Sequence, residues 1–339
     1  MGKRILQGTL CSLGILFLIL DSTTALKGAQ DGLTLCICSI IPSIFPFLVL
    51  LGVLTPMLCG ATPRFLRPLA MLLRIPQGSE GIFLTGIIGG YPTGAQSVYG
   101  AWKRGQLSKG DAQRMLAFCS NAGPSFLFGI LGTKFSECWM IWGLWGIHIL
   151  SAIIVAIILP GGSRNQSSIS PAPAVTLSKS LKNAVTTMGS ICGWVVLFRI
   201  LIAFLDRWFL WLLPSNMQIA VYGILELANG CCSADLIIGE GMRFILCSGM
   251  LAFGGLCVTM QTISVAAELG LGQYIPGKFT QALISMILSI AVQKLLFPVG
   301  VQAAISPYFL VICGIFAVIL PIILLKTKNR GSIPHAIGV

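Results

Sequence analysis

Small polar side chains gather in a few short segments of a chain that is otherwise strongly apolar. Those that could hydrogen-bond a solute lie beside glycine or proline, and they are Tyr91, Thr93, Gln96, Ser120, Asn121, Ser125, Asn229, Thr259 and Gln261. Hydroxyls and amides both donate and accept hydrogen bonds, so a group of them can hold a small polar molecule by several contacts. These residue types indicate binding rather than bond-making chemistry.

The same segments carry residues that interrupt helices, namely Gly89, Gly90, Pro92, Gly94, Gly123, Pro124, Gly254 and Gly255. Pro124 has no N–H, so it leaves a carbonyl near Ser120 without its helical partner. In hydrocarbon, broken backbone is tolerated only where protein buries it or where it lines a cavity, and paired breaks in two halves point to a transporter site. Glycine and proline also allow ordinary close packing of membrane helices. Several breaks, each with a polar neighbour, favour a binding site.

Glu226 is the acidic residue in the most apolar surroundings, within the run 219–228. A carboxyl at the centre of a bilayer costs on the order of 3 kcal/mol, so it is normally functional. Glu226 could couple transport by binding a proton or Na⁺. The alternative is a structural carboxyl hydrogen-bonded to Asn229. Similarly, Arg199 could contact an anionic solute or pair with Asp206.

The composition places the chain in a membrane. Of its 339 residues 55% are apolar and only 9% are charged, and the mean hydropathy is +0.91; a soluble domain carries about 25% charged residues. The net charge of +12 comes from basic clusters beside apolar runs, which is typical of cytoplasmic loops. No basic nucleic-acid module is evident, so we expect the lipid bilayer, not nucleic acid, as partner.

Catalytic and metal-dependent functions find no support in the sequence. Most of the twelve cysteines lie in apolar runs, where cysteine acts as a small hydrophobe. No spacing matches a zinc site, and His148 and His335 are the two histidines. Neither a phosphate-binding loop nor a nucleophile elbow is present. We expect no enzyme, no resident metal and no cofactor apart from a coupling H⁺ or Na⁺.

Apolar runs of about 20 residues predict membrane crossings. The clear ones are 43–59, 138–159, 189–213 and 305–325, with shorter ones at 5–20 and 281–297. The first run lacks a convincing cleavage site and predicts a retained helix. Amphipathic patterns over 63–74 and 177–188 favour separate helices lying in the headgroup plane over ends of bundle helices. Basic residues flank both termini, which predicts that both are cytoplasmic.

The resulting fold class is an all-α polytopic membrane protein with two repeats, each containing broken helices. The polar stretch 160–173 divides the chain near its midpoint. We predict N-terminal membrane helices (1–60), a first repeat (61–160), a linker (161–176), a second repeat (177–325) and a cytoplasmic tail (326–339).

The glycine and asparagine motifs resemble the nucleoside-recognition (Gate) family, and most closely its branch of YlbJ-like sporulation integral membrane proteins. The resemblance rests on 89–95 (GGYPTGA), 119–124 (CSNAGP) and 253–256 (FGGL) with Gln261, and it spans roughly residues 40–325. It implies a fold related to the cores of concentrative nucleoside transporters, with helical hairpins and broken helices meeting at a central site. It also implies a solute such as dipicolinate or a nucleoside-like compound, and a role in sporulation.

The leading hypothesis is a secondary transporter or permease for a small polar organic solute, in a bacterial cytoplasmic or spore-associated membrane. A homo-oligomer is compatible with the sequence. The alternative is a membrane scaffold or assembly factor of sporulation that has lost transport. An ion channel would need a continuous polar path, and we expect no regular polar helix face to supply one.

Overall fold

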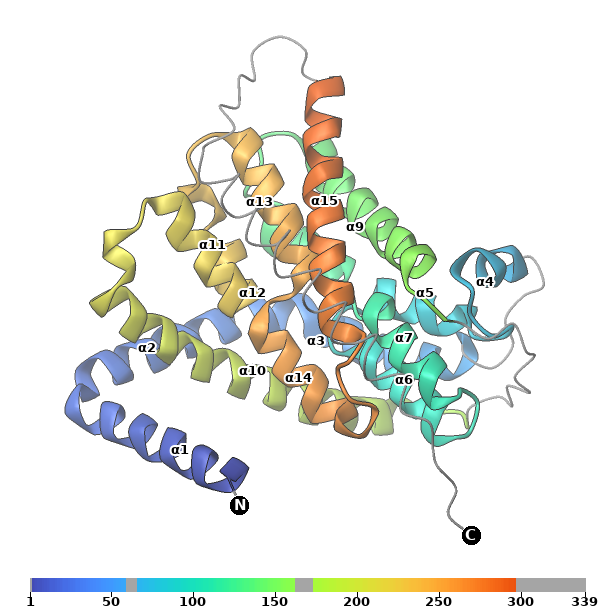
Figure 1. Ribbon diagram of the computed structural model, residues 1–339, viewed down its shortest axis with the longest axis horizontal. Coiled ribbons are helices and arrows are strands. Elements are labelled where there is room, and N and C mark those ends of the chain that lie inside the picture. Colours follow the sequence, from blue (N-terminus) through green and yellow to red (C-terminus); the bar gives the residue numbers. More distant parts are fainter. Residues whose placement is uncertain (1, 59–65, 162–172, 297–339) are drawn as a thin grey trace.

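The computed structural model describes residues 2–58, 66–161 and 173–296, and every regular element in these ranges is a helix (Figure 1). Five helical runs there are long and apolar enough to cross a membrane, at Ser22–Leu58, Cys138–Ile158, Leu177–Trp208, Glu240–Leu269 and Tyr274–Leu295. The prediction of an all-α fold is confirmed for this part of the chain, and the five long apolar helices are compatible with the predicted polytopic membrane protein. The predicted crossing at 305–325, the tail at 326–339 and most of the linker lie outside the described residues.

The first part of the chain contains α1 (Gly2–Leu20), α2 (Ser22–Leu35), α3 (Ile41–Leu58), α4 (Arg67–Leu73), α5 (Glu80–Gly89), α6 (Thr93–Lys103), α7 (Lys109–Cys119), α8 (Pro124–Phe126) and α9 (Cys138–Ile158). The remainder contains α10 (Leu177–Trp208), α11 (Ser215–Leu225), α12 (Leu227–Cys232), α13 (Glu240–Phe253), α14 (Gly255–Ala266) and α15 (Tyr274–Leu296). A π-helical turn (Cys36–Ile40) joins α2 directly to α3.

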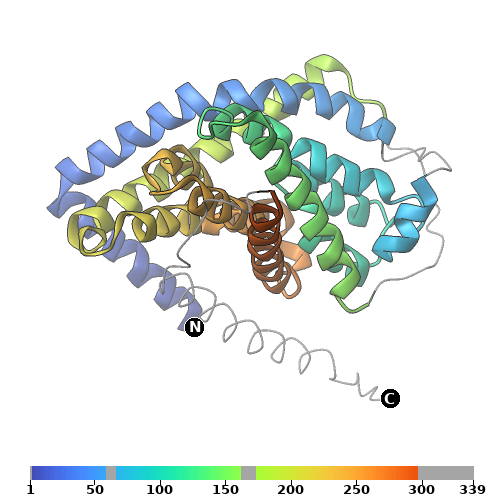
Figure 2. The same cartoon turned by 90° about the horizontal axis from the view of Figure 1, so that it is seen from above.

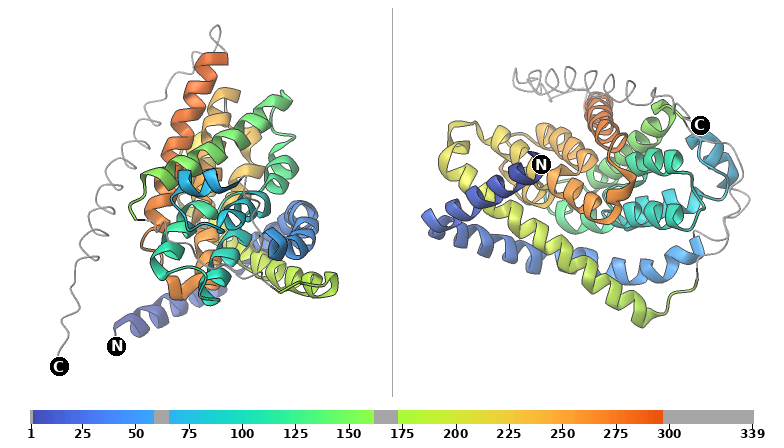
Figure 3. Two further views of the ribbon diagram at one scale, coloured as in Figure 1. Left: turned by 90° about the vertical axis from the view of Figure 1, so that its right-hand side faces the viewer. Right: turned by 60° about the horizontal axis from the view of Figure 1, so that its bottom comes forward.

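The α2–α3 run and α10 lie side by side in opposite directions along one edge of the molecule (Figures 2 and 3). Three glycines allow this approach. A Cβ on Gly28 would lie 2.9 Å from the backbone of Ile200, one on Gly32 would lie 3.0 Å from Val196, and one on Gly52 would meet the Ser180 hydroxyl at 2.1 Å. Small residues at such contacts let membrane helices pack through backbone atoms.

Residues 177–188 do not form a helix of their own, contrary to the expectation from the amphipathic pattern. They are the first turns of α10, which continues without interruption to Trp208. The Thr176 hydroxyl caps the helix by accepting a hydrogen bond from the Lys179 amide at 3.3 Å. No proline interrupts this helix. The polar stripe of residues 177–188 and the predicted crossing that follows it therefore belong to one continuous helix. In the segment predicted at 63–74, the described helix is α4.

Helix α15 packs against α7, α9 and α13 (Figure 1). Beside it, α5, α6 and α7 meet at a single backbone atom. A Cβ on either Gly86 or Gly94 would lie 1.9 Å from the carbonyl oxygen of Cys119. Glycine at these two positions therefore lets three short helices converge, and it fixes where their ends lie.

Candidate functional site

The two predicted breaks of the first half touch each other. Helix α5 ends at Gly89 and α6 begins at Thr93, while α7 ends at Cys119 and α8 begins at Pro124. The segments cross at Gly90 and Gly123, where a Cβ on Gly90 would lie 2.6 Å from the Gly123 nitrogen. Gly90 has a φ of +69° and a ψ of −168°, a conformation that is essentially restricted to glycine.

The two breaks of the second half adjoin the first pair through Tyr91. Helix α13 ends at Phe253 and Gly254 separates it from α14, and a Cβ on Gly254 would lie 2.9 Å from the Tyr91 ring. The Tyr91 hydroxyl donates to the Leu251 carbonyl at 3.4 Å. A Cβ on Gly255 would in turn lie 3.3 Å from the Leu227 nitrogen, beside the break between α11 and α12. All four interruptions thus form one contiguous region.

Lys278, which the sequence analysis did not single out, lies inside this region. Its side chain is buried, with 1% of the residue exposed. The ammonium Nζ donates to the Ser120 carbonyl at 2.5 Å and to Gln281 Oε1 at 2.6 Å, and it lies 5.2 Å from the centre of the Tyr91 ring. Ser120 follows the last residue of α7 and has an extended backbone, so its carbonyl has no helical partner. The lysine therefore occupies the acceptor that the break exposes.

A hydrogen-bond network extends from Lys278 to the second first-half break. Gln281 Nε2 donates to Asn121 Oδ1 at 3.0 Å, and Asn121 Nδ2 donates to the Phe118 carbonyl at 2.7 Å. The amide of Ala122 donates to His148 Nε2 at 3.0 Å. The hydroxyl of Ser120 and Nδ1 of His148 are buried and make no hydrogen bond within the described residues. Two polar atoms of the network are therefore left without a protein partner.

Helix α15 carries a regular buried polar face, so the expectation that no helix has one is wrong. The face consists of Lys278, Gln281, Ser285, Ser289 and Gln293, each at most 5% exposed. Their spacing of three or four residues is one helical period. This periodicity was the available sequence signal for Lys278. Bonds such as Gln293 Nε2 to the Gly241 carbonyl, at 2.6 Å, tie the face to neighbouring helices.

Glu226 caps α12 and also faces a cavity. Its carboxylate accepts hydrogen bonds from the Ala228 amide at 3.0 Å, from the Asn229 amide at 2.6 Å and from Asn229 Nδ2 at 2.7 Å. These contacts match the structural alternative considered for this residue. The cavity of about 40 Å³ beside it is also lined by Tyr91, Ser125 and Gln261. It holds little more than ordered water, since one water occupies about 30 Å³ in the liquid.

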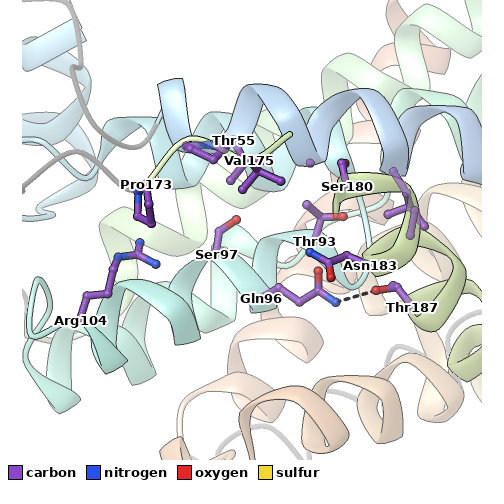
Figure 4. Close-up of a pocket in the computed structure, with 14 residues that line it drawn as sticks. Thr55, Thr93, Gln96, Ser97, Arg104, Pro173, Val175, Ser180, Asn183 and Thr187 are labelled. Carbon is purple, nitrogen blue, oxygen red and sulfur yellow. Dashed lines mark hydrogen bonds between the residues drawn. The ribbon is translucent and has the colours of Figure 1, made fainter. Parts of the chain in front are cut away.

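Thr93 and Gln96 line a different and larger cavity, of about 270 Å³, between α3, α6 and α10 (Figure 4). Gln96 Nε2 donates to the Thr187 hydroxyl at 3.2 Å. Seven of the nine predicted binding residues are therefore divided between this cavity, the small cavity and the Lys278 network. Asn229 and Thr259 line neither cavity; Asn229 bonds Glu226, and the Thr259 hydroxyl donates to the Gly255 carbonyl at 3.1 Å.

Arg199 lies on the outer part of α10 and pairs with two carboxylates. Its Nη2 lies 2.9 Å from Asp31 Oδ2, and its Nη1 lies 3.5 Å from Asp206 Oδ2. The pairing with Asp206 was one of the two alternatives. Asp31 was not foreseen because it comes from α2, more than 160 residues away in the chain.

Comparison with known proteins gives no match to any family model, any curated protein or any solved structure. The geometry of the helix breaks and of Lys278 therefore carries the functional argument, and the resemblance to the Gate family stays a prediction.

Proposed function

We propose that this chain is a secondary transporter or permease for a small polar organic solute, which binds where the four helix breaks meet. The observation that carries the proposal is the buried side-chain amino group of Lys278. Ionisable groups inside membrane helices are costly and typically mark the path of a substrate or ion. All ten acidic residues lie in the described ranges, and none forms a salt bridge with Lys278. A negatively charged group on the solute would supply the missing counter-charge.

The proposal includes membership of the Gate family, with the sporulation branch as the nearest relatives. Of the two solute classes implied by that resemblance, Lys278 favours an anion such as dipicolinate over an uncharged nucleoside-like compound. Coupling to H⁺ or Na⁺ is assigned to Glu226, which faces the small cavity, and Lys278 is a second group able to carry a proton. The two-repeat organisation and the location in a bacterial cytoplasmic or spore-associated membrane belong to the same proposal.

The test is uptake into liposomes containing the purified protein, with dipicolinate, nucleosides and related mono- and dicarboxylates as solutes. Lys278→Met keeps the length of the side chain and removes the ammonium, so we expect uptake to fall at least about tenfold while the variant still inserts and folds. Lys294→Met is the matched control, because Lys294 is an exposed residue on the same helix. Its uptake should equal that of the unmodified chain.

Two further variants examine the remaining residues of the site. Asn121→Leu removes the acceptor of Gln281, and Glu226→Gln removes the charge that faces the small cavity. Retained uptake in both would discard this location for the solute. Normal uptake with unchanged pH and Na⁺ dependence in Glu226→Gln would discard it as the coupling group. If no solute enters the liposomes or raises the melting temperature of the protein, the non-transporting scaffold is the better description.

A further inference from the structure

The larger cavity is built from one face each of α3, α6 and α10. Two hydroxyls that line this cavity lack partners, that of Thr93 at the inner end and that of Thr55 on the side near Pro173 and Val175 (Figure 4). Thr93 is 8% exposed and its Oγ1 makes no hydrogen bond within the described residues, and the same holds for Oγ1 of Thr55. Both residues line the cavity. Buried hydroxyls almost always have a partner, so these two indicate that water or a ligand occupies the space.

The other end of the cavity is exposed and carries a positive charge. Arg104 lies there beside Pro173, at the opposite end from Thr93 and Thr187 (Figure 4). Its guanidinium is held by Gln106, whose Oε1 accepts from Nε at 3.2 Å and from Nη2 at 3.1 Å. None of the acidic side chains, all of them within the described ranges, forms a salt bridge with it. An arginine held at the mouth of a polar cavity attracts anions.

The two cavities follow each other along the same helices. On α3, Leu48 lines the larger cavity and Ile44, one turn earlier, lines the small one. On α10, Thr187 lines the larger cavity and Ile191, one turn later, lines the small one. The Gln96–Thr187 hydrogen bond therefore lies at the inner end of the larger cavity, between the exposed mouth and the helix breaks.

We propose that this cavity, which we term the α3–α6–α10 vestibule, is the outer binding site for a small organic anion on its way to the helix breaks. Arg104 attracts the charged group, the Thr55 hydroxyl hydrogen-bonds the ligand on the side near Pro173, and the Thr93 hydroxyl does so at the inner end. The volume of about 270 Å³ accommodates a small organic molecule, whereas the inner cavity of about 40 Å³ must widen before the solute can bind at the helix breaks. The inference rests on the proposed function for the direction of travel, but its anion preference can be measured without any transported solute.

The experiment places a cysteine at Ser97, which lines the vestibule between its two ends. The Ser97→Cys chain, in phosphatidylcholine vesicles, is treated with the anionic reagent 2-sulfonatoethyl methanethiosulfonate or its cationic trimethylammonioethyl counterpart. Mass spectrometry of the peptide containing position 97 gives the rate for that site alone. We expect the anionic reagent to react faster, relative to the rates of the two reagents with a free thiol in solution.

Adding Arg104→Gln should lower the ratio of anionic to cationic rates at least about threefold, because one unit charge at the mouth of the same cavity acts on the two reagents with opposite sign. Lys103→Gln is the matched control. Its ammonium is 2.6 Å from the Glu268 carboxylate and Lys103 does not line the vestibule, so the ratio should stay unchanged. An equal loss in both variants would reduce the effect to general surface charge and overturn the proposal.

Two outcomes separate this inference from the proposed function. If the chain takes up a solute but the cysteine at position 97 does not react, the vestibule proposal is wrong and the proposed transport function stands. Anion-selective labelling that Arg104→Gln abolishes, in a chain that transports nothing, supports the vestibule and discards transport. Repeating the labelling in phosphatidylglycerol vesicles identifies the source of the anion. Strong protection there would make the cavity a lipid-headgroup site and would overturn its assignment to a solute, whereas unchanged labelling supports that assignment.

Discussion

Gly90→Ala should be among the most destabilising single-methyl additions in this chain. The new Cβ would lie 2.6 Å from the Gly123 nitrogen, and the contact atom is backbone that cannot rotate away. Overpacking of this kind costs about 1–3 kcal/mol. The backbone conformation at position 90, with φ of +69° and ψ of −168°, adds a further cost of about 1–3 kcal/mol for any residue with a Cβ. The expected loss in the free energy of unfolding is therefore about 2–6 kcal/mol.

The measurement is unfolding in mixed micelles with a rising fraction of sodium dodecyl sulfate, followed by the fluorescence of the seven tryptophans. Gly146→Ala is the control, because a Cβ on this exposed glycine of α9 would meet nothing within 4 Å. That change should be neutral or should stabilise the helix by up to about 1 kcal/mol. If the two variants unfold at the same fraction of dodecyl sulfate, the segments around Gly90 and Gly123 do not cross as described.

The remaining predictions concern charged groups away from the helix breaks. Arg114→Met should lower the free energy of unfolding by about 3 kcal/mol, because the buried guanidinium donates to carbonyls at the ends of α4 and α9, including that of Leu73 at 3.0 Å; an unchanged unfolding midpoint in the same micelle assay would contradict this. The hydrogen bond to Glu268 raises the pKa of Lys103 above 10.5. The stabilisation from this pair is therefore present from neutral pH up to pH 10.5, and it is lost as the pH rises through the raised pKa of Lys103 or falls through the lowered pKa of Glu268. The melting temperatures of the unmodified chain and Lys103→Met should differ near neutral pH and converge both at strongly alkaline and at acidic pH. A difference that stays constant through that range would exclude the pair as its source.

The helix interruptions could be predicted because their causes are local. Pro124 lacks an N–H, and Gly90 and Gly254 adopt positive φ, so the short motifs around them already specify where helices end. The membrane character of the helices could also be predicted, because it depends on composition and on the length of the apolar runs. The continuity of α10 was harder to predict, since an amphipathic pattern that changes into an apolar one does not by itself require a break.

Lys278 was not predicted, because a single lysine near the start of a helix resembles an interfacial anchor. Only the spacing from Lys278 to Gln293 distinguishes the buried polar face, and the partners of Lys278 and Gln281 lie more than 100 residues away, in the segment after α7 and in α9. The vestibule presented no local signal at all. Gln96 meets Thr187 across 91 positions, and the cavity exists only because α3, α6 and α10 pack together.

The hydrogen bond from Lys278 to the Ser120 carbonyl links ligand binding to the backbone of a helix break. A protonated Lys278 has three N–H donors, of which the Ser120 carbonyl and Gln281 Oε1 take two, so a negative group can bind the third without displacing either acceptor. A ligand that instead drew the side chain away from Ser120 would leave that carbonyl unpaired, and the segment between α7 and α8 would lose a contact that fixes it to α15. Affinity for such a ligand would be reduced by the free energy of that contact, and by reciprocity any movement that breaks the contact would strengthen binding by the same amount.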